Sequence, residues 1–109
     1  MKVIDNETLY QGKVSESVLV HSFEEYKRLG GKRDVLDCYA LIKHNAKSAE
    51  GNYISYMDQT LSGIPMSDRC LETQRLKAQA WWYILHLWFN RPLRKVSYSN
   101  FDLDEFNRL

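Results

Sequence analysis

The sequence predicts a mostly helical α+β domain, in which a small N-terminal β-hairpin or meander packs with four or five helices around one long central helix. Three observations give this prediction. Short β-branched stretches fall in the first twenty residues, apolar residues recur at helical spacing from residue 21 onward, and aromatic side chains crowd into residues 81–89. We therefore expect a single domain over 1–109, with the β element at 1–20 and helices over most of 21–109.

The β element is predicted from short apolar stretches at the start of the chain. Val3-Ile4, Val14 and Val18-Leu19-Val20 are separated by Asp5-Asn6 and Gly12. Valine and isoleucine favour strands, whereas aspartate, asparagine and glycine favour turns. Two or three short strands are expected here.

Two short helices are predicted next. Ser22 can cap the first, because its hydroxyl and the side chain of Glu25 can each satisfy a free amide of the first turn. The pair Gly30-Gly31 ends this helix, since glycine accepts the left-handed geometry of a helix C-cap. Asp34 caps a second helix, which is expected to fade around His44-Asn45.

A third short helix and then the longest one follow. Residues 46–52 are predicted to be a polar connection, and 53–61 a short helix that ends at a Ser-Gly-Ile-Pro turn. Ser67 is placed to cap the longest helix, about 67–90. This helix is expected to stop before Pro92, because proline cannot continue a helix.

Two apolar stripes run along the predicted long helix, so its second half is apolar nearly all round. Either this helix lies in the middle of the domain, or one stripe is an exposed contact surface; the central position is favoured. The first stripe contains Leu71, Gln74, Ala78, Trp82, Leu85 and Phe89, and the second contains Leu76, Ala80, Ile84 and Leu87.

The C-terminal part is predicted to hold one more short strand and one more helix. The segment Lys95-Val96-Ser97-Tyr98 has the composition of a short strand. Asp102 and Glu105 form a capping box for a terminal helix that bears Leu103 and Phe106.

Composition gives no sign of a nucleic-acid or membrane protein. The 15 basic and 14 acidic residues leave a net charge of +1, and neither half of the chain is strongly charged. No segment approaches the roughly 18 consecutive apolar residues of a membrane span, and Met1 to Val14 lacks the features of a secretory signal. We therefore expect a cytoplasmic protein that does not bind membranes.

No arrangement of residues predicts a metal site, a cofactor or a catalytic centre. Cys70 and His86 lie sixteen positions apart on one predicted helix, about 24 Å, so they cannot share a metal ion. Cys38 and Cys70 fall on apolar helix faces and are expected to be reduced core residues. The sequence thus predicts a protein that is not an enzyme, although an acid pair assembled in three dimensions stays open.

A basic loop is the first candidate contact site. Lys27 and Arg28 precede the Gly30-Gly31 pair, and Lys32 and Arg33 follow it, ahead of a helix N-terminus where an anion could bind. The favoured alternative is a helix C-terminus whose cations stabilise the dipole, followed by a flexible turn.

The long helix supplies the other candidate contacts. Arg69 and Arg75, with Lys77, form a basic edge that would face DNA if the segment were a helix-turn-helix, although an ordinary helical hairpin fits the apolar pattern better. Tyr83 and Trp88 are aromatic candidates for a partner contact or for base stacking, with burial in the core as the alternative.

The predicted function is a small non-enzymatic protein-binding module, accessory or inhibitor-like, that occupies a surface on a larger protein. Balanced charge, surplus aromatic area and the lack of a coherent site favour protein contact over catalysis. In size and composition the chain is analogous to small proteins of mobile genetic elements or to their immunity partners. The alternative function is a nucleic-acid-binding regulator that uses the basic loop and the edge of the long helix. A homodimer is a further alternative partner state.

Overall fold

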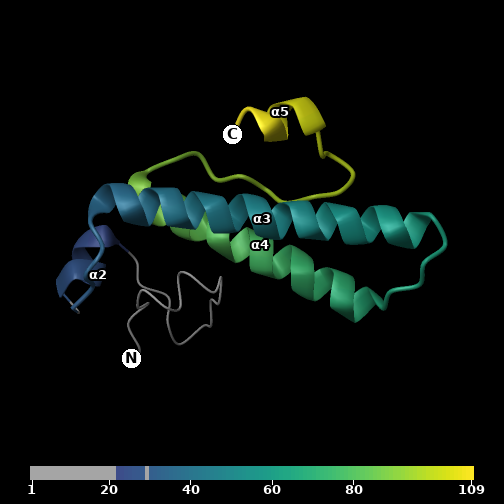
Figure 1. Cartoon of the computed structure of the whole chain (residues 1–109), viewed down its shortest axis with the longest axis horizontal. Coiled ribbons are helices and arrows are strands. Elements are labelled where there is room, and N and C mark those ends of the chain that lie inside the picture. The colour runs from purple at the N-terminus through teal and green to yellow at the C-terminus, as the bar shows by residue number, and fades with distance from the viewer. Residues whose placement is uncertain (1–21, 29) are drawn as a thin grey trace.

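The computed structural model describes residues 22–28 and 30–109. In this part, α2 (Phe23–Arg28) precedes two long helices, α3 (Val35–Leu61) and α4 (Asp68–Phe89), and α5 (Leu103–Asn107) lies near the C-terminus. Helices α3 and α4 lie side by side as an antiparallel hairpin, and α2 lies near the start of α3 (Figure 1). After α4 the chain runs back along α3 before it forms α5 (Figure 1).

The predicted α+β fold is wrong for the described residues, which are 69% helical and contain no strand. The β element predicted at 1–20 lies outside the described residues. The predicted strand 95–98 is not a strand, because no other extended segment of the described chain lies beside it to complete a ladder of backbone hydrogen bonds. The side chain of Gln79 in α4 holds this segment in place instead, because it accepts a hydrogen bond from the amide of Val96.

The prediction of two short helices joined by a polar connection at 46–52 is also wrong. These residues continue α3, which therefore has 27 residues and is longer than α4, with 22. The connection is predicted from the polar character of these residues, which also include Gly51, a poor helix former. In the structure, Ala46 and Ala49 are buried in the core between α3 and α4, and this packing outweighs the low helix propensity. The fold is thus a pair of long helices, not a set of helices around residues 67–90.

The predicted helix starts are confirmed by their capping hydrogen bonds. The Ser22 hydroxyl accepts from the Glu25 amide at 3.0 Å, and the Ser67 hydroxyl accepts from the Cys70 amide at 3.1 Å. The carboxylate of Asp34 caps α3, and that of Asp102 caps α5, in the same way. Each cap satisfies an amide that has no partner within its own helix.

The ends of the helices follow the predicted breakers. The amide of Gly31 donates to the carbonyl of Tyr26 at 2.9 Å, and Gly30 has the positive φ of a helix terminus. Asn90, with φ 53° and ψ 37°, is the left-handed C-cap of α4. A left-handed asparagine followed by Pro92 turns the chain back toward α3.

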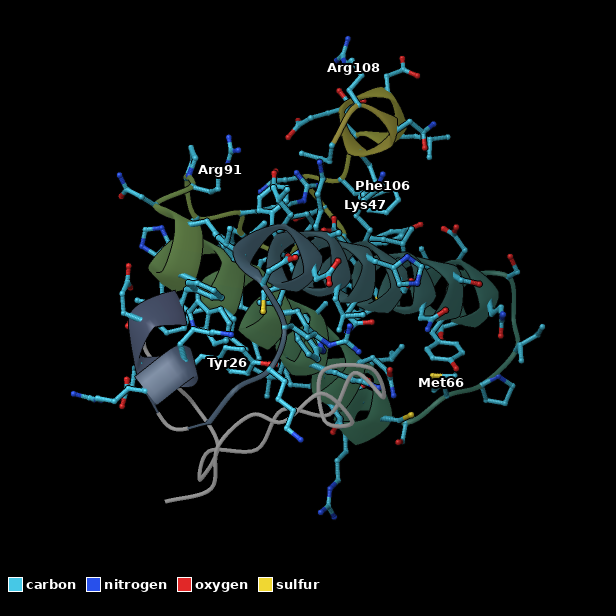
Figure 2. All side chains as sticks on the ribbon, turned by 60° about the vertical axis from the view of Figure 1, so that its left-hand side comes forward. Tyr26, Lys47, Met66, Arg91, Phe106 and Arg108 are labelled. Atoms are coloured by element: carbon cyan, nitrogen blue, oxygen red, sulfur yellow. The ribbon has the colours of Figure 1, made fainter. Side chains whose placement is uncertain are left out.

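The core lies between α3 and α4 and is closed at one end by α2. Trp81 and Ile84 of α4 are fully buried, as is Ile42 of α3. Tyr26 of α2 is also fully buried, and its ring centroid lies 5.4 Å from that of Trp88. Figure 2 shows Tyr26 between α2 and the long helices, so this side chain attaches the short helix to the hairpin.

Candidate functional site

The residues of the basic loop lie at one end of the hairpin. Lys27 and Arg28 belong to α2, whereas Lys32 and Arg33 lie in the turn that leads to α3. Lys27 Nζ donates to the carbonyl of Arg33 at 3.4 Å, and Arg28 lies 3.9 Å from a carboxylate oxygen of Glu25. Lys27 and Arg28 thus have contacts within the chain, and the side chains of Lys27, Arg28 and Lys32 are exposed.

The basic edge of α4 lies elsewhere. Arg69 is exposed near the start of α4, and the guanidinium of Arg75 makes two hydrogen bonds with the carboxylate of Glu72, which lower the pKa of Glu72. Trp88, the α4 residue that contacts α2, lies about 20 Å along the helix from Arg75. The two basic regions proposed for nucleic acid are therefore not brought together into one surface.

The two aromatic candidates on α4 differ in exposure. Trp88 is 7% exposed and packs in the core between Tyr26 and Phe89. Tyr83 is 40% exposed, and its ring lies 6.2 Å from that of His86. Of this pair, only Tyr83 can take part in a contact without the core opening.

Tyr83 borders an apolar groove on the surface of α4, with a volume of about 450 Å³. Leu76 and Tyr83 lie two helical turns apart on the same side of α4, and the small side chain of Ala80 between them leaves the hollow. Leu93, from the chain after α4, closes the side of the groove. Leu76 is 53% exposed and Leu93 is 50% exposed, so the groove opens to solvent.

The position of Leu93 is fixed by Gln79. The Gln79 side chain donates from Nε2 to the carbonyl of Arg94 at 2.9 Å and accepts at Oε1 from the amide of Val96 at 2.8 Å. This amide side chain thus makes the pair of hydrogen bonds that a neighbouring strand would make. Because side chains alternate along an extended chain, Val96 is buried while Leu93 and Lys95 face outward beside α4.

The rim of the groove is basic. Lys95 lines it, and Lys77 follows Leu76 on α4 with its side chain exposed. Within the described residues, neither lysine has a carboxylate within salt-bridge distance. An apolar floor with lysines beside it suits an amphipathic segment that carries acidic residues next to its apolar side chains.

A second hollow, of about 510 Å³, lies between α3 and the segment that follows α4, and Leu93 and Lys95 line it as well as the groove. Its inner end is formed by Glu50 of α3, which is 1% exposed, and by Trp82 of α4. The Glu50 carboxylate accepts from Trp82 Nε1 at 2.7 Å and from Arg94 Nε and Nη2 at 2.8 Å each. Arg94 also donates from Nη1 to Glu105 at 2.9 Å, so this guanidinium joins α3 to the residues of α5. We refer to this hollow as the cleft.

Glu50, Gln79 and Arg94 shape both hollows, and none of them was singled out from the sequence. Glu50 falls in the polar connection predicted at 46–52, and Gln79 is a polar residue of the predicted long helix, so both are typical of solvent-facing positions. Arg94 lies in a segment without a helical pattern. One signal was present for Glu50. Steps of three and four residues from Cys38 and Ile42 lead to Ala46, Ala49 and Glu50, which places this carboxylate beside the buried stripe of a continuous helix.

The described residues contain no group of three His, Cys, Asp or Glu side chains that could hold a metal ion. Both cysteines are free thiols; Cys38 is buried and Cys70 is partly exposed. Burial raises the pKa of the Cys38 thiol, which disfavours its reactive thiolate form. No helix in the described part of the chain is long and apolar enough to span a membrane.

Comparisons of the chain with protein-family models, with curated proteins and with solved structures find no match. The functional argument therefore depends on the groove and the cleft themselves.

Proposed function

We propose that this chain is a small non-enzymatic protein-binding module, accessory or inhibitor-like, which acts by occupying a surface on a larger protein. The observation that carries the proposal is the apolar groove formed by Leu76, Ala80, Tyr83 and Leu93. Half-exposed leucines beside a half-exposed tyrosine lose water-accessible apolar area when a partner covers them, and this favours association.

The groove also indicates the chemistry of the partner. Its hollow lies between side chains two turns apart on a helix, a spacing that accepts one bulky apolar side chain of a partner helix. Exposed Lys77 and Lys95 beside the hollow favour acidic residues next to that apolar side chain. The partner surface we propose is therefore an amphipathic segment with an acidic flank.

The test compares two exposed leucines on the long helices. Leu76 lies in the groove, whereas Leu36, which is 76% exposed on α3, does not line it. Leu76→Glu places a carboxylate on the floor, where it repels an acidic partner, and Leu36→Glu makes the same chemical change elsewhere. Both substitutions replace solvent-exposed side chains, so each is expected to change the free energy of unfolding by no more than about 0.5 kcal/mol.

The measurement is affinity purification from an extract of the native host, with and without nuclease, followed by mass spectrometry. We expect the wild-type chain and Leu36→Glu to retain the same protein after nuclease treatment, and Leu76→Glu to lose it. Equal retention by both variants would show that the groove is not the contact surface. Co-purified nucleic acid that disappears with nuclease or high salt would instead support the nucleic-acid-binding function.

A further inference from the structure

We propose that the cleft between α3 and the segment after α4 binds a small organic phosphate. The cleft shares Leu93 and Lys95 with the apolar groove, but Lys43 and Arg91, which would contact the phosphate, do not line the groove. Phosphate binding there does not depend on the proposed protein partner. Its argument begins with the charge of the side chains that line it.

Cations outnumber carboxylates along the cleft. Five cationic side chains and two carboxylates line it, an excess of three charges in a chain whose net charge is +1. The two carboxylates, Glu50 and Glu105, both accept hydrogen bonds from Arg94. Arg94 and these two acids together carry one negative charge, which offsets only one of the four remaining cations, so the cleft keeps an excess of three positive charges that attracts anions.

Two of these cations lie against the same aromatic ring. Lys43 Nζ lies 5.7 Å from the centroid of the Tyr39 ring, and the guanidinium carbon of Arg91 lies 5.2 Å from it. Lys43 comes from α3 and Arg91 from the chain just after α4, where Figure 2 shows it. Neither has a carboxylate within salt-bridge distance among the described residues. The ammonium and the guanidinium are therefore both available to donate hydrogen bonds to a phosphate in the cleft.

The position of Arg91 is fixed by the end of α4. The carbonyl of Arg91 accepts from His86 Nδ1 at 2.6 Å, so the backbone that carries the guanidinium is tied to the last turn of the helix. Tyr39 is itself held by an edge-to-face contact with Phe89, with ring centroids 5.2 Å apart. The two cations thus extend from a fixed frame, which lowers the entropy lost when an anion binds.

The rest of the cleft suits an organic group. Pro92, Leu93 and Phe101 line it, so carbon atoms attached to the phosphate would be removed from water there. The volume of about 510 Å³ is within the range of small-molecule sites. Trp82 lines the inner end, and its indole donates to Glu50, so this group reports on occupancy of the cleft.

The experiment titrates the full chain with phenyl phosphate and, separately, with inorganic phosphate, and follows the indole N–H signal of Trp82 by NMR. Two double variants remove the same charge: Lys43→Gln/Arg91→Gln inside the cleft, and Arg69→Gln/Lys77→Gln on the exposed surface of α4. We expect phenyl phosphate to shift the Trp82 signal and to bind at least about tenfold more weakly to the first variant only.

Three outcomes would overturn the proposal. They are no shift of the Trp82 signal at millimolar phenyl phosphate, equal weakening in both double variants, and equal affinity for inorganic phosphate. The second outcome would mean that only overall charge matters, and the third that the organic group is not recognised. Melting temperatures without ligand check that both variants are folded. Because Leu76 does not line the cleft, Leu76→Glu is expected to leave phenyl phosphate binding unchanged whether or not the groove has a partner.

Discussion

Arg94 and Glu50 form a bidentate pair, with Nε and Nη2 of the guanidinium each 2.8 Å from a carboxylate oxygen that lies 44 residues earlier in the chain. Glu50 is 1% exposed, and its hydrogen bonds raise the pKa of Arg94, which stays charged. The same guanidinium lies over the Trp82 ring, 5.7 Å from its centroid. This pair therefore fixes the segment after α4 against the two long helices.

Replacement of Glu50 tests the importance of this pair. Glu50→Ala leaves the half-buried guanidinium of Arg94 and the buried indole N–H of Trp82 without their acceptor, so we expect a loss of about 3 kcal/mol in the free energy of unfolding. Glu105→Ala removes a carboxylate that is 57% exposed and is expected to cost less than about 1 kcal/mol. Urea unfolding measures both. Similar losses for the two variants would contradict the central place of Glu50.

Replacement of Gln79 tests how the extended segment is held. Gln79→Ala removes both hydrogen bonds to the backbone of Arg94 and Val96, and we expect it to destabilise the fold by about 1 to 3 kcal/mol. Gln79→Glu keeps the acceptor for Val96 but turns a carboxylate oxygen toward the carbonyl of Arg94, so the two acceptors repel and the loss should be at least as large. Hydrogen exchange of the Val96 amide gives the local readout. An unchanged exchange rate in Gln79→Ala would mean that another group protects this amide.

Two glycines are expected to respond in opposite directions to alanine. A Cβ at Gly31 would lie 2.3 Å from the Tyr26 ring, so Gly31→Ala forces the ring or the turn to move and should cost about 1 to 3 kcal/mol. A Cβ at Gly51 would meet only Phe106, at 3.9 Å, within the interior of α3. Gly51→Ala should therefore stabilise the fold by about 0.5 to 1 kcal/mol. Thermal unfolding measures the change in stability of both variants. A change of the same sign in Gly31→Ala and Gly51→Ala would contradict the prediction.

Stability is expected to fall in alkaline solution. Burial raises the pKa of the Tyr26 phenol above its ordinary value of 10.0, and a hydrogen bond to Asp58 at 2.5 Å raises that of Tyr98. A raised pKa means that the folded state holds the proton more tightly than the unfolded state. The stability that each phenol contributes is thus complete below its ordinary pKa. It is lost as the pH rises through the pKa of the group in the folded state. The pKa of Cys38 is also raised, so a further loss of stability begins as the pH rises above the ordinary thiol pKa of 9.0.

The measurement is the free energy of unfolding from about pH 8 upward, across the ordinary pKa values of tyrosine and cysteine, above which the loss begins. Tyr26→Phe should flatten part of the alkaline decline, because phenylalanine has no proton to lose. Tyr98→Phe serves as the comparison at an exposed hydrogen bond. A decline that is unchanged in Tyr26→Phe would assign the alkaline loss to other groups.

The sequence by itself determined the helix boundaries that depend on local chemistry. Ser22, Asp34, Ser67 and Asp102 cap helices as predicted, and Asn90 ends α4 before Pro92. Each of these features depends on hydrogen bonds or backbone geometry within a few residues, so it can be recognised without the fold. The sequence also predicts that most rings of residues 81–89 are buried, with Tyr83 or one tryptophan reaching the surface, and Tyr83 is 40% exposed beside the apolar groove.

Only the tertiary structure decided the continuous α3, the two hollows and the roles of the polar residues between them. Residues 46–52 are locally unfavourable for a helix and become helical because Ala46 and Ala49 pack in the core that α3 shares with α4. The bonds of Gln79 to Arg94 and Val96, and of Glu50 to Arg94, join residues 15 to 44 positions apart. No local pattern encodes such pairs, since their energy depends on removal from water and on geometry that exist only once the helices have packed.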